Sequence, residues 1–170
     1  MKTEKISLTA LDNASEIAVR DCMGLKSGES VLVVTDEPLR KIGYSLWEAS
    51  KRLGNESFIV EIIPRKTNGE EPPKQVADLM KTVDVVLCPT SKSLTHTDAR
   101  RSASSLGVRI ATLPSVTEEI MIRCMNADYN KIAARTYRLC EMMEKTKTIR
   151  VTTSLGTDIR MPIEGRTAHA

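Results

Sequence analysis

The stretch that decides the fold is Val31-Leu32-Val33-Val34-Thr35, which follows the turn residues 26–29 and ends at Asp36-Glu37-Pro38. A continuous apolar run of this kind, rich in β-branched residues and without polar alternation, is typical of a strand buried on both faces. Parallel sheets bury their strands in this way because helices cover both of their faces. The run therefore predicts a central strand of a parallel α/β sheet.

Helical periodicity is present on both sides of this strand. The segment before it has apolar residues three and four positions apart and ends at Gly24, which predicts a helix over 9–23. The segment after it has the same spacing between Pro38 and Gly54 and predicts a helix over 38–53. The apolar positions are Leu11, Ala14, Ala18 and Cys22 in the first helix and Leu39, Ile42, Leu46, Ala49 and Leu53 in the second.

Strands and helices continue to alternate along the chain. Further strands are predicted at 58–63, 83–88 and 108–113, and helices at 73–81 and 96–106, with a surface loop over 64–73. This alternation implies parallel βαβ units with right-handed crossovers. The predicted fold class is α/β, with an open, mostly parallel, Rossmann-like sheet that has helices on both faces. The pattern does not give the strand order.

The C-terminal part changes its period from 3.6 to 2. Ser115-Val116-Thr117-Glu118 has the form of a capping box and predicts a helix through Cys124, followed by a second helix over 127–145. Alternating residues on either side of Leu155-Gly156-Thr157 predict a β-hairpin, so a new structural unit is expected there. The predicted division is an α/β domain over 1–147 and a hairpin over 148–170.

Composition and charge exclude several classes of protein. The 170 residues are 41% hydrophobic and 28% charged, as in an ordinary globular protein of one domain, with or without a short appendage. The net charge is only +3, and basic residues alternate with acidic ones, so we expect no nucleic acid partner. No stretch approaches the ~18 apolar residues of a membrane span. The N-terminal residues 1–5 do not lead into a signal sequence, so we expect a cytoplasmic protein without a membrane partner.

The sulfur-containing residues are expected to be structural. The four cysteines stand far apart and have neither a Cys-x-x-Cys spacing nor a nearby histidine, so we interpret them as reduced core residues. Four methionines in the C-terminal helices are expected to pack in the core as well. The residues concerned are Cys22, Cys88, Cys124 and Cys140, and Met121, Met125, Met142 and Met143.

Asp36 and Glu37 stand where a dinucleotide site would need glycines. Backbone amides approach a pyrophosphate only through a glycine-rich turn, and acids would repel it, so NAD and ATP sites of the familiar kinds are disfavoured. Two interpretations remain for these carboxylates. The favoured one is that they cap the N-terminus of the following helix; the other is that they hold a metal or an amine.

The loop after the strand at 83–88 is the candidate ligand site, because open parallel sheets bind ligands beyond the carboxyl ends of their strands. Hydroxyl, imidazole and guanidinium groups gather there at a helix N-terminus, which suits a phosphate or a carboxylate. The alternative is a purely structural role, with Thr95 capping the helix and Asp98 three residues later. The candidate ligand-binding residues are Ser91, Ser93, His96, Thr97 and Arg100.

Catalytic chemistry has few candidates. The only histidines are His96 and His169, the second at the end of the chain, so we expect no histidine metal site. Ser93, His96 and Asp98 are local neighbours, whereas a catalytic triad needs its members arranged around a substrate. We therefore predict no catalytic residue and no metal ligand in this chain.

Several short motifs together resemble a known family. Their order resembles the N-terminal half of the aminopeptidase T, or leucyl aminopeptidase-like, family of metal-dependent exopeptidases. The motifs are Gly-Glu-Ser-Val-Leu-Val-Val-Thr-Asp at 28–36, Glu-Pro-Pro at 71–73, Ser-Leu-Thr-His-Thr-Asp-Ala-Arg-Arg at 93–101, Gly-Val-Arg-Ile-Ala-Thr-Leu-Pro at 107–114, Thr-Ser-Leu-Gly-Thr-Asp at 153–158 and Gly-Arg at 165–166.

This resemblance implies a cytoplasmic two-domain hydrolase in which an α/β domain precedes a catalytic domain. That second domain would hold two divalent metal ions, such as zinc, cobalt or manganese, and would begin at the hairpin. The implied partner is a peptide substrate, with a homo-oligomer possible, and this chain would be the non-catalytic part. The alternative is a stand-alone module that binds a small anionic ligand at the loop 91–100.

Overall fold

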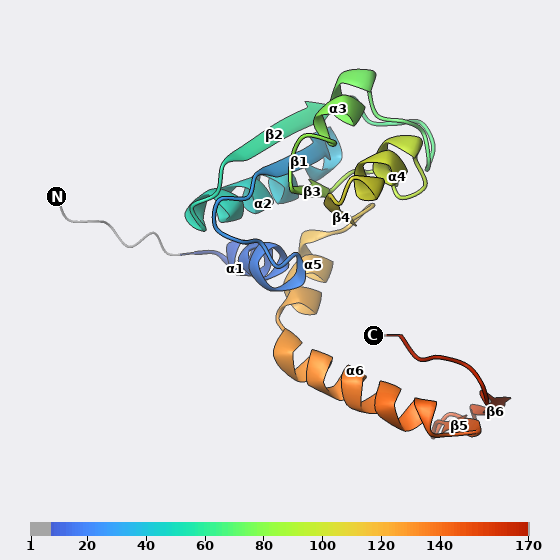
Figure 1. Cartoon of the computed structure of the whole chain (residues 1–170). Helices are drawn as coiled ribbons and strands as arrows, with labels where there is room; N and C mark the ends of the chain where they lie inside the picture. Colours follow the sequence, from blue (N-terminus) through green and yellow to red (C-terminus); the bar gives the residue numbers. More distant parts are fainter. Residues whose placement is uncertain (1–7, 170) are drawn as a thin grey trace. The chain divides into compact units, whose positions relative to one another are not determined.

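The computed structural model describes residues 8–169 (Figure 1), and these divide into two compact units between Ala127 and Asp128. The expectation for residues 1–5 lies outside the described residues. The last long helix thus groups with the hairpin, whereas the sequence pattern placed the division after residue 147. Whether the hairpin opens a further domain stays a prediction.

Unit 1 alternates helices and strands as the periodicity predicts. Its elements are α1 Ala10–Ile17 with a π-helical extension Ala18–Cys22, β1 Val31–Asp36, a 3₁₀ turn Glu37–Leu39, α2 Arg40–Arg52, β2 Ser57–Ile62, α3 Lys74–Leu79, β3 Val85–Cys88, α4 Asp98–Ser105, β4 Arg109–Thr112 and α5 Glu118–Met125.

The four strands of unit 1 form one parallel sheet in the order β2-β1-β3-β4. All six residues of β1 are buried, which confirms it as a central strand. Its side chains alternate between two cores: Val31 and Val33 pack with residues of α1, α2 and α5, whereas Leu32 and Val34 pack with residues of α3 and α4. The predicted α/β fold, with helices on both faces of a parallel sheet, is confirmed (Figure 1).

Helix α2 lies unusually close to β1, and Gly43 makes this possible. A Cβ atom at Gly43 would stand 2.6 Å from Oγ1 and 2.7 Å from Cβ of the buried Thr35. No side chain fits at that distance, so glycine is required where the helix crosses the strand. The close approach fixes the carboxyl end of β1 against α2.

Three structural expectations were wrong in detail. The cap of α5 is Thr117, which accepts from the Ile120 amide, and not Ser115, which has a positive φ of 52°. Only one cysteine, Cys88, is buried, and burial raises the pKa of its thiol to about 12. Of the methionines, Met121 is buried and Met125 packs against the core, whereas Met142 and Met143 are exposed. Cys22 and Cys124 are exposed and Cys140 is half-buried.

Unit 2 consists of a helix and a hairpin with an apolar surface. Helix α6 spans Tyr129–Glu144 and has no buried residue, and β5 Thr148–Thr152 pairs antiparallel with β6 Asp158–Pro162, which confirms the predicted hairpin. No helix in the described part of the chain combines the length and apolar character needed to cross a membrane.

Candidate functional site

The carboxyl edge of the sheet has its topological switch point between β1 and β3. From β1 the chain crosses to β2 on one side, and from β2 it returns past β1 to β3 on the other side. The loops after β1 and β3 therefore lead away from each other and leave room between them. Ligands of open α/β sheets bind at this place, outside the carboxyl ends of the strands.

Asp36, the last residue of β1, connects the two loops at the switch point. Its Oδ2 accepts two hydrogen bonds from Ser91, at 2.7 Å from the amide and 2.6 Å from the hydroxyl. The side chain of Asp36 makes no capping hydrogen bond to the turn that follows it, so the prediction that it caps this helix is wrong. Asp36 is buried, with 1% of its surface exposed. Its carboxylate instead binds Ser91 in the loop after the neighbouring strand β3.

The loop between β4 and α5 is tied to the same place through Ser115. The Ser115 amide donates to the Thr90 carbonyl at 3.0 Å, and its hydroxyl donates to the Ser91 carbonyl at 2.8 Å. The positive φ of Ser115 is uncommon for a residue other than glycine, and these two bonds hold it. Three loops, from β1, β3 and β4, thus converge at the switch point.

An open groove of about 440 Å³ lies beside this convergence. Lys41 of α2 and Glu118 of α5 form an ion pair of 2.7 Å at the groove, both partly exposed. The groove combines apolar walls with a few polar groups, which is the composition of small-molecule sites. Its lining residues are Pro38, Leu39, Lys41, Ile42, Ser91, Ser115, Val116, Thr117 and Glu118.

The N-terminus of α4, where the sequence predicts an anion, is occupied by a side chain of the same unit. The carboxylate of Glu71 accepts from the Asp98 amide at 2.6 Å and from the Ala99 amide at 3.1 Å. The third amide, of Arg100, donates to the hydroxyl of Thr97, which is the cap. The expectation that Thr95 caps this helix is therefore wrong. Glu71 belongs to the Glu-Pro-Pro motif, and this capping contact is its structural role.

The five predicted ligand-binding residues do not gather around one point. Ser91 faces Asp36, whereas the Ser93 hydroxyl donates to Thr95 at 2.8 Å. Thr97 is fully buried beneath the loop and its hydroxyl donates to the Leu94 carbonyl. His96 is exposed and Arg100 is half-buried. The prediction of an anionic ligand on these residues stays a prediction, with the helix amides already engaged.

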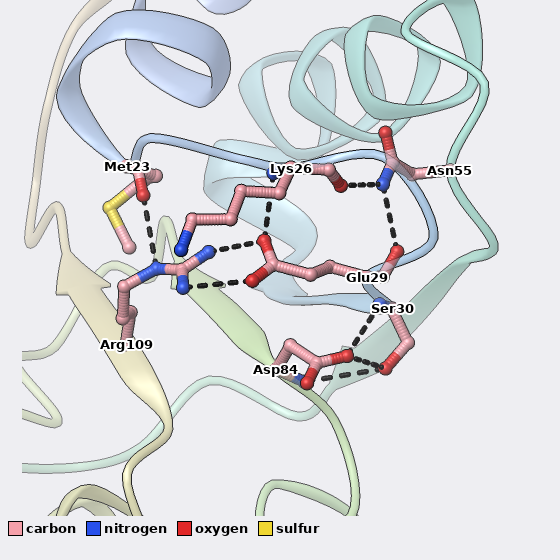
Figure 2. Close-up of polar contacts among 7 residues, drawn as sticks. All are labelled: Met23, Lys26, Glu29, Ser30, Asn55, Asp84 and Arg109. Carbon is pink, nitrogen blue, oxygen red and sulfur yellow. Dashed lines mark hydrogen bonds and ion pairs between the residues drawn. The ribbon is translucent and has the colours of Figure 1, made fainter.

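The opposite, amino edge of the sheet holds a dense polar cluster that the sequence pattern did not reveal (Figure 2). Arg109 of β4 forms two hydrogen bonds with Glu29, of 3.0 and 2.5 Å, and a third with the Met23 carbonyl. The Arg109 guanidinium, helped by the Lys26 amide, lowers the pKa of Glu29 to about 2. Asn55 donates to two carbonyls of the same turn, those of Lys26 and Glu29. The hydrogen bonds of this cluster tie the turn before β1 to β4, so we assign it a structural role.

The described residues do not fit a catalytic metal centre. No group of three or more His, Cys, Asp or Glu side chains within residues 8–169 could hold a metal ion.

Comparison with models of protein families shows to which family the chain belongs. The family model NicX: 2,5-dihydroxypyridine 5,6-dioxygenase matches residues 14–170. The chain belongs to the NicX family. No curated protein matches it.

Two solved structures share the fold of this NicX family member. 2,5-Dihydroxypyridine dioxygenase from Pseudomonas putida KT2440 is 15% identical, with a TM-score of 0.63 over 92% of this chain and 48% of that chain. Wild-type AmpT from Thermus thermophilus is 12% identical, with a TM-score of 0.53 over 91% of this chain and 53% of that chain. The NicX family chain thus spans about half the length of each.

These comparisons sharpen the resemblance to aminopeptidase T. AmpT shares the fold at 12% identity, so the expected structural likeness to aminopeptidase T holds. The family, however, is that of NicX, and peptidase activity does not follow from a shared fold.

Proposed function

We propose that this chain is the non-catalytic α/β part of a NicX-type dioxygenase that acts on a hydroxylated pyridine. The observation that carries the proposal is the family match over residues 14–170. The residue inventory supports a non-catalytic role, because the described residues offer no group of three metal-ligating side chains. In this proposal the groups that activate dioxygen come from polypeptide outside residues 8–169.

The surface of unit 2 supports the proposal that Asp128–Ala170 packs against further polypeptide in the active protein. Its helix has no buried residue, and large apolar side chains lie in water on both the helix and the hairpin. Surfaces of this kind mark interaction sites. The exposed residues include Tyr137, Leu139 and Met142 on α6 and Val151, Ile159 and Met161 on the hairpin.

The test uses the native protein, captured from its source cells with an antibody raised against this chain of 18.8 kDa. An oxygen electrode then measures oxygen uptake after addition of 2,5-dihydroxypyridine, with the 170-residue chain alone as control. We expect uptake by the native protein and none by the control. Absence of uptake by an intact native preparation would contradict the proposal, as would full activity of the chain alone.

Aminopeptidase activity is the second candidate, supported by the fold shared with AmpT and by the motif order. The same native preparation is given leucine p-nitroanilide with zinc, cobalt or manganese, and release of p-nitroaniline is followed. Hydrolysis without oxygen uptake would replace the dioxygenase proposal by the peptidase one. The size of the captured protein on an immunoblot shows whether a second half accompanies this chain.

A further inference from the structure

The carboxylate of Asp36 has one oxygen that the fold leaves without a partner. Oδ2 accepts both hydrogen bonds from Ser91, whereas Oδ1 is buried and has no hydrogen-bond partner in the structure. Asp36 is 1% exposed, so bulk water does not reach this oxygen. Buried acceptors in folded proteins almost always have a donor. The orphan oxygen therefore indicates a donor that is not part of the described chain.

The Asp36 carboxylate lies beside the groove at the switch point. Ser91 lines the groove and at the same time holds the Asp36 carboxylate, so the carboxylate lies directly behind the groove wall. The rest of the wall is largely apolar, with Leu39, Ile42 and Val116. A ligand that fits here has a compact apolar body and one hydrogen-bond donor.

The charges around the groove favour a cationic donor. Among the groove residues and the carboxylate behind Ser91, the acids are Glu118 and Asp36 and the one base is Lys41, which is already paired with Glu118. The site thus has an excess of negative charge, and a charged N–H donor forms the stronger hydrogen bond with a carboxylate. A metal ion is disfavoured because the described residues provide no set of three ligands.

We propose that the groove at the β1/β3 switch point binds the protonated amine of a small organic cation, with the ammonium group donating to Oδ1 of Asp36. Because this oxygen is buried in the present arrangement, side chains of the groove wall have to move before the contact forms. The ion pair between Lys41 and Glu118 then lies at the groove beside the bound cation. This site goes beyond the proposed dioxygenase function and does not depend on it.

Calorimetric titration of the 170-residue chain with n-butylamine hydrochloride tests the proposal. Sodium butyrate and 1-butanol serve as probes of the same size with negative and zero charge. We expect saturable binding of butylamine only, weakened at least ~10-fold in Asp36→Asn, which loses one charge-assisted hydrogen bond. Asparagine keeps an oxygen for Ser91, so the variant is expected to fold. Glu37→Gln removes an equal charge from the exposed neighbouring residue and should bind like the wild type.

Three results would overturn the proposal. These are equal binding of butylamine by the wild type and Asp36→Asn, equal binding of butanol and butylamine, and absence of amine binding, which would leave a buried water as the donor.

Should Asp36→Asn fail to fold, Glu118→Lys tests the same site from its exposed side. This variant reverses a charge at the groove and should weaken butylamine about 3-fold. Unchanged affinity in Glu118→Lys would equally contradict the assignment.

Discussion

The strands β1 and β3 are joined at both ends by the same contact between a serine and an aspartate. At the amino end, the amide and hydroxyl of Ser30 donate to Oδ2 of Asp84 at 2.8 and 2.9 Å. At the carboxyl end, the amide and hydroxyl of Ser91 donate to Oδ2 of Asp36 at 2.7 and 2.6 Å. The hydrogen bonds are alike, but Asp84 is exposed and Asp36 is 1% exposed.

This difference separates a stabilising contact from a candidate binding site. The second oxygen of Asp84 belongs to an exposed side chain and can be hydrated, and neighbouring polar groups are paired by Arg109 and Asn55. The second oxygen of Asp36 is buried and has no hydrogen-bond partner among the described residues. The amino end therefore contributes to stability, whereas the carboxyl end keeps an acceptor available beside a groove.

The largest effect is expected from a substitution that separates α2 from the carboxyl end of β1. Gly43→Val places a branched side chain where even a Cβ would stand 2.6 Å from Thr35, so we expect a loss of about 3 kcal/mol in the free energy of unfolding. Urea denaturation followed by circular dichroism measures it. Lys41→Val, on the exposed face of the same helix, should change stability by no more than ~0.5 kcal/mol. Similar losses in the two variants would refute the close approach.

The second prediction compares the two serine contacts directly. Ser91→Ala leaves a buried carboxylate with one donor fewer, and we expect a loss of about 2 kcal/mol in the free energy of unfolding. Ser30→Ala removes the same hydroxyl beside an exposed carboxylate, where water replaces it, so its loss should be smaller. Both are measured by urea denaturation. An equal loss at the two ends would mean that burial of Asp36 does not increase the cost of removing the serine hydroxyl.

The third prediction concerns the pH dependence of the amino end. Arg109→Gln removes the paired hydrogen bonds to Glu29 and should cost about 1 kcal/mol at pH 7, because the pair is partly screened by water. The pKa of Glu29 is lowered from 4.5 to about 2 in the folded state. The stabilisation is therefore complete above pH 4.5 and disappears as the pH falls towards 2. Thermal melts between pH 7 and 2.5 should show wild type and variant converging, and a constant gap would contradict the assignment.

The smallest effect is expected at Asp84. Hydrogen bonds from Ser30 lower the pKa of this exposed carboxyl group, so Asp84→Asn should lower the midpoint of thermal unfolding slightly at pH 7. The difference should shrink below the usual aspartate pKa and vanish only below the lowered pKa of the folded state, where the wild-type carboxyl group also becomes protonated. Asp36→Asn serves as the comparison. A larger loss in Asp84→Asn than in Asp36→Asn would reverse the order of the two ends.

The sequence predicts the architecture well because the architecture rests on local patterns. The run at 31–35 and the spacing of apolar residues in α2 follow from side-chain burial within one element, and both were confirmed. The caps were misplaced by two residues, at Thr117 rather than Ser115 and at Thr97 rather than Thr95. Each of these segments contains several hydroxyl residues, and periodicity does not say which of them ends the loop.

A different reason explains why the candidate site could not be predicted from the sequence. Asp36 and Ser91 are 55 residues apart, and they meet only because β3 lies beside β1. Strand order is a global property that no local pattern contains, and the same holds for the Glu71 carboxylate at α4. The sequence did single out Asp36 and Ser91 separately, as an acid after one strand and a hydroxyl after another. The structure assembles the two candidates into one place.

The most direct test of this account follows the amide signals of Ser91 and Ser30 in a ¹H–¹⁵N correlation spectrum while n-butylamine hydrochloride is added. The wild type and Asp84→Asn should show a saturable shift of the Ser91 signal with the Ser30 signal unmoved, and Asp36→Asn should show neither shift. Movement of the Ser30 signal alone, or a Ser91 shift that survives in Asp36→Asn, would contradict the claim that the carboxyl end of β1 holds the binding site.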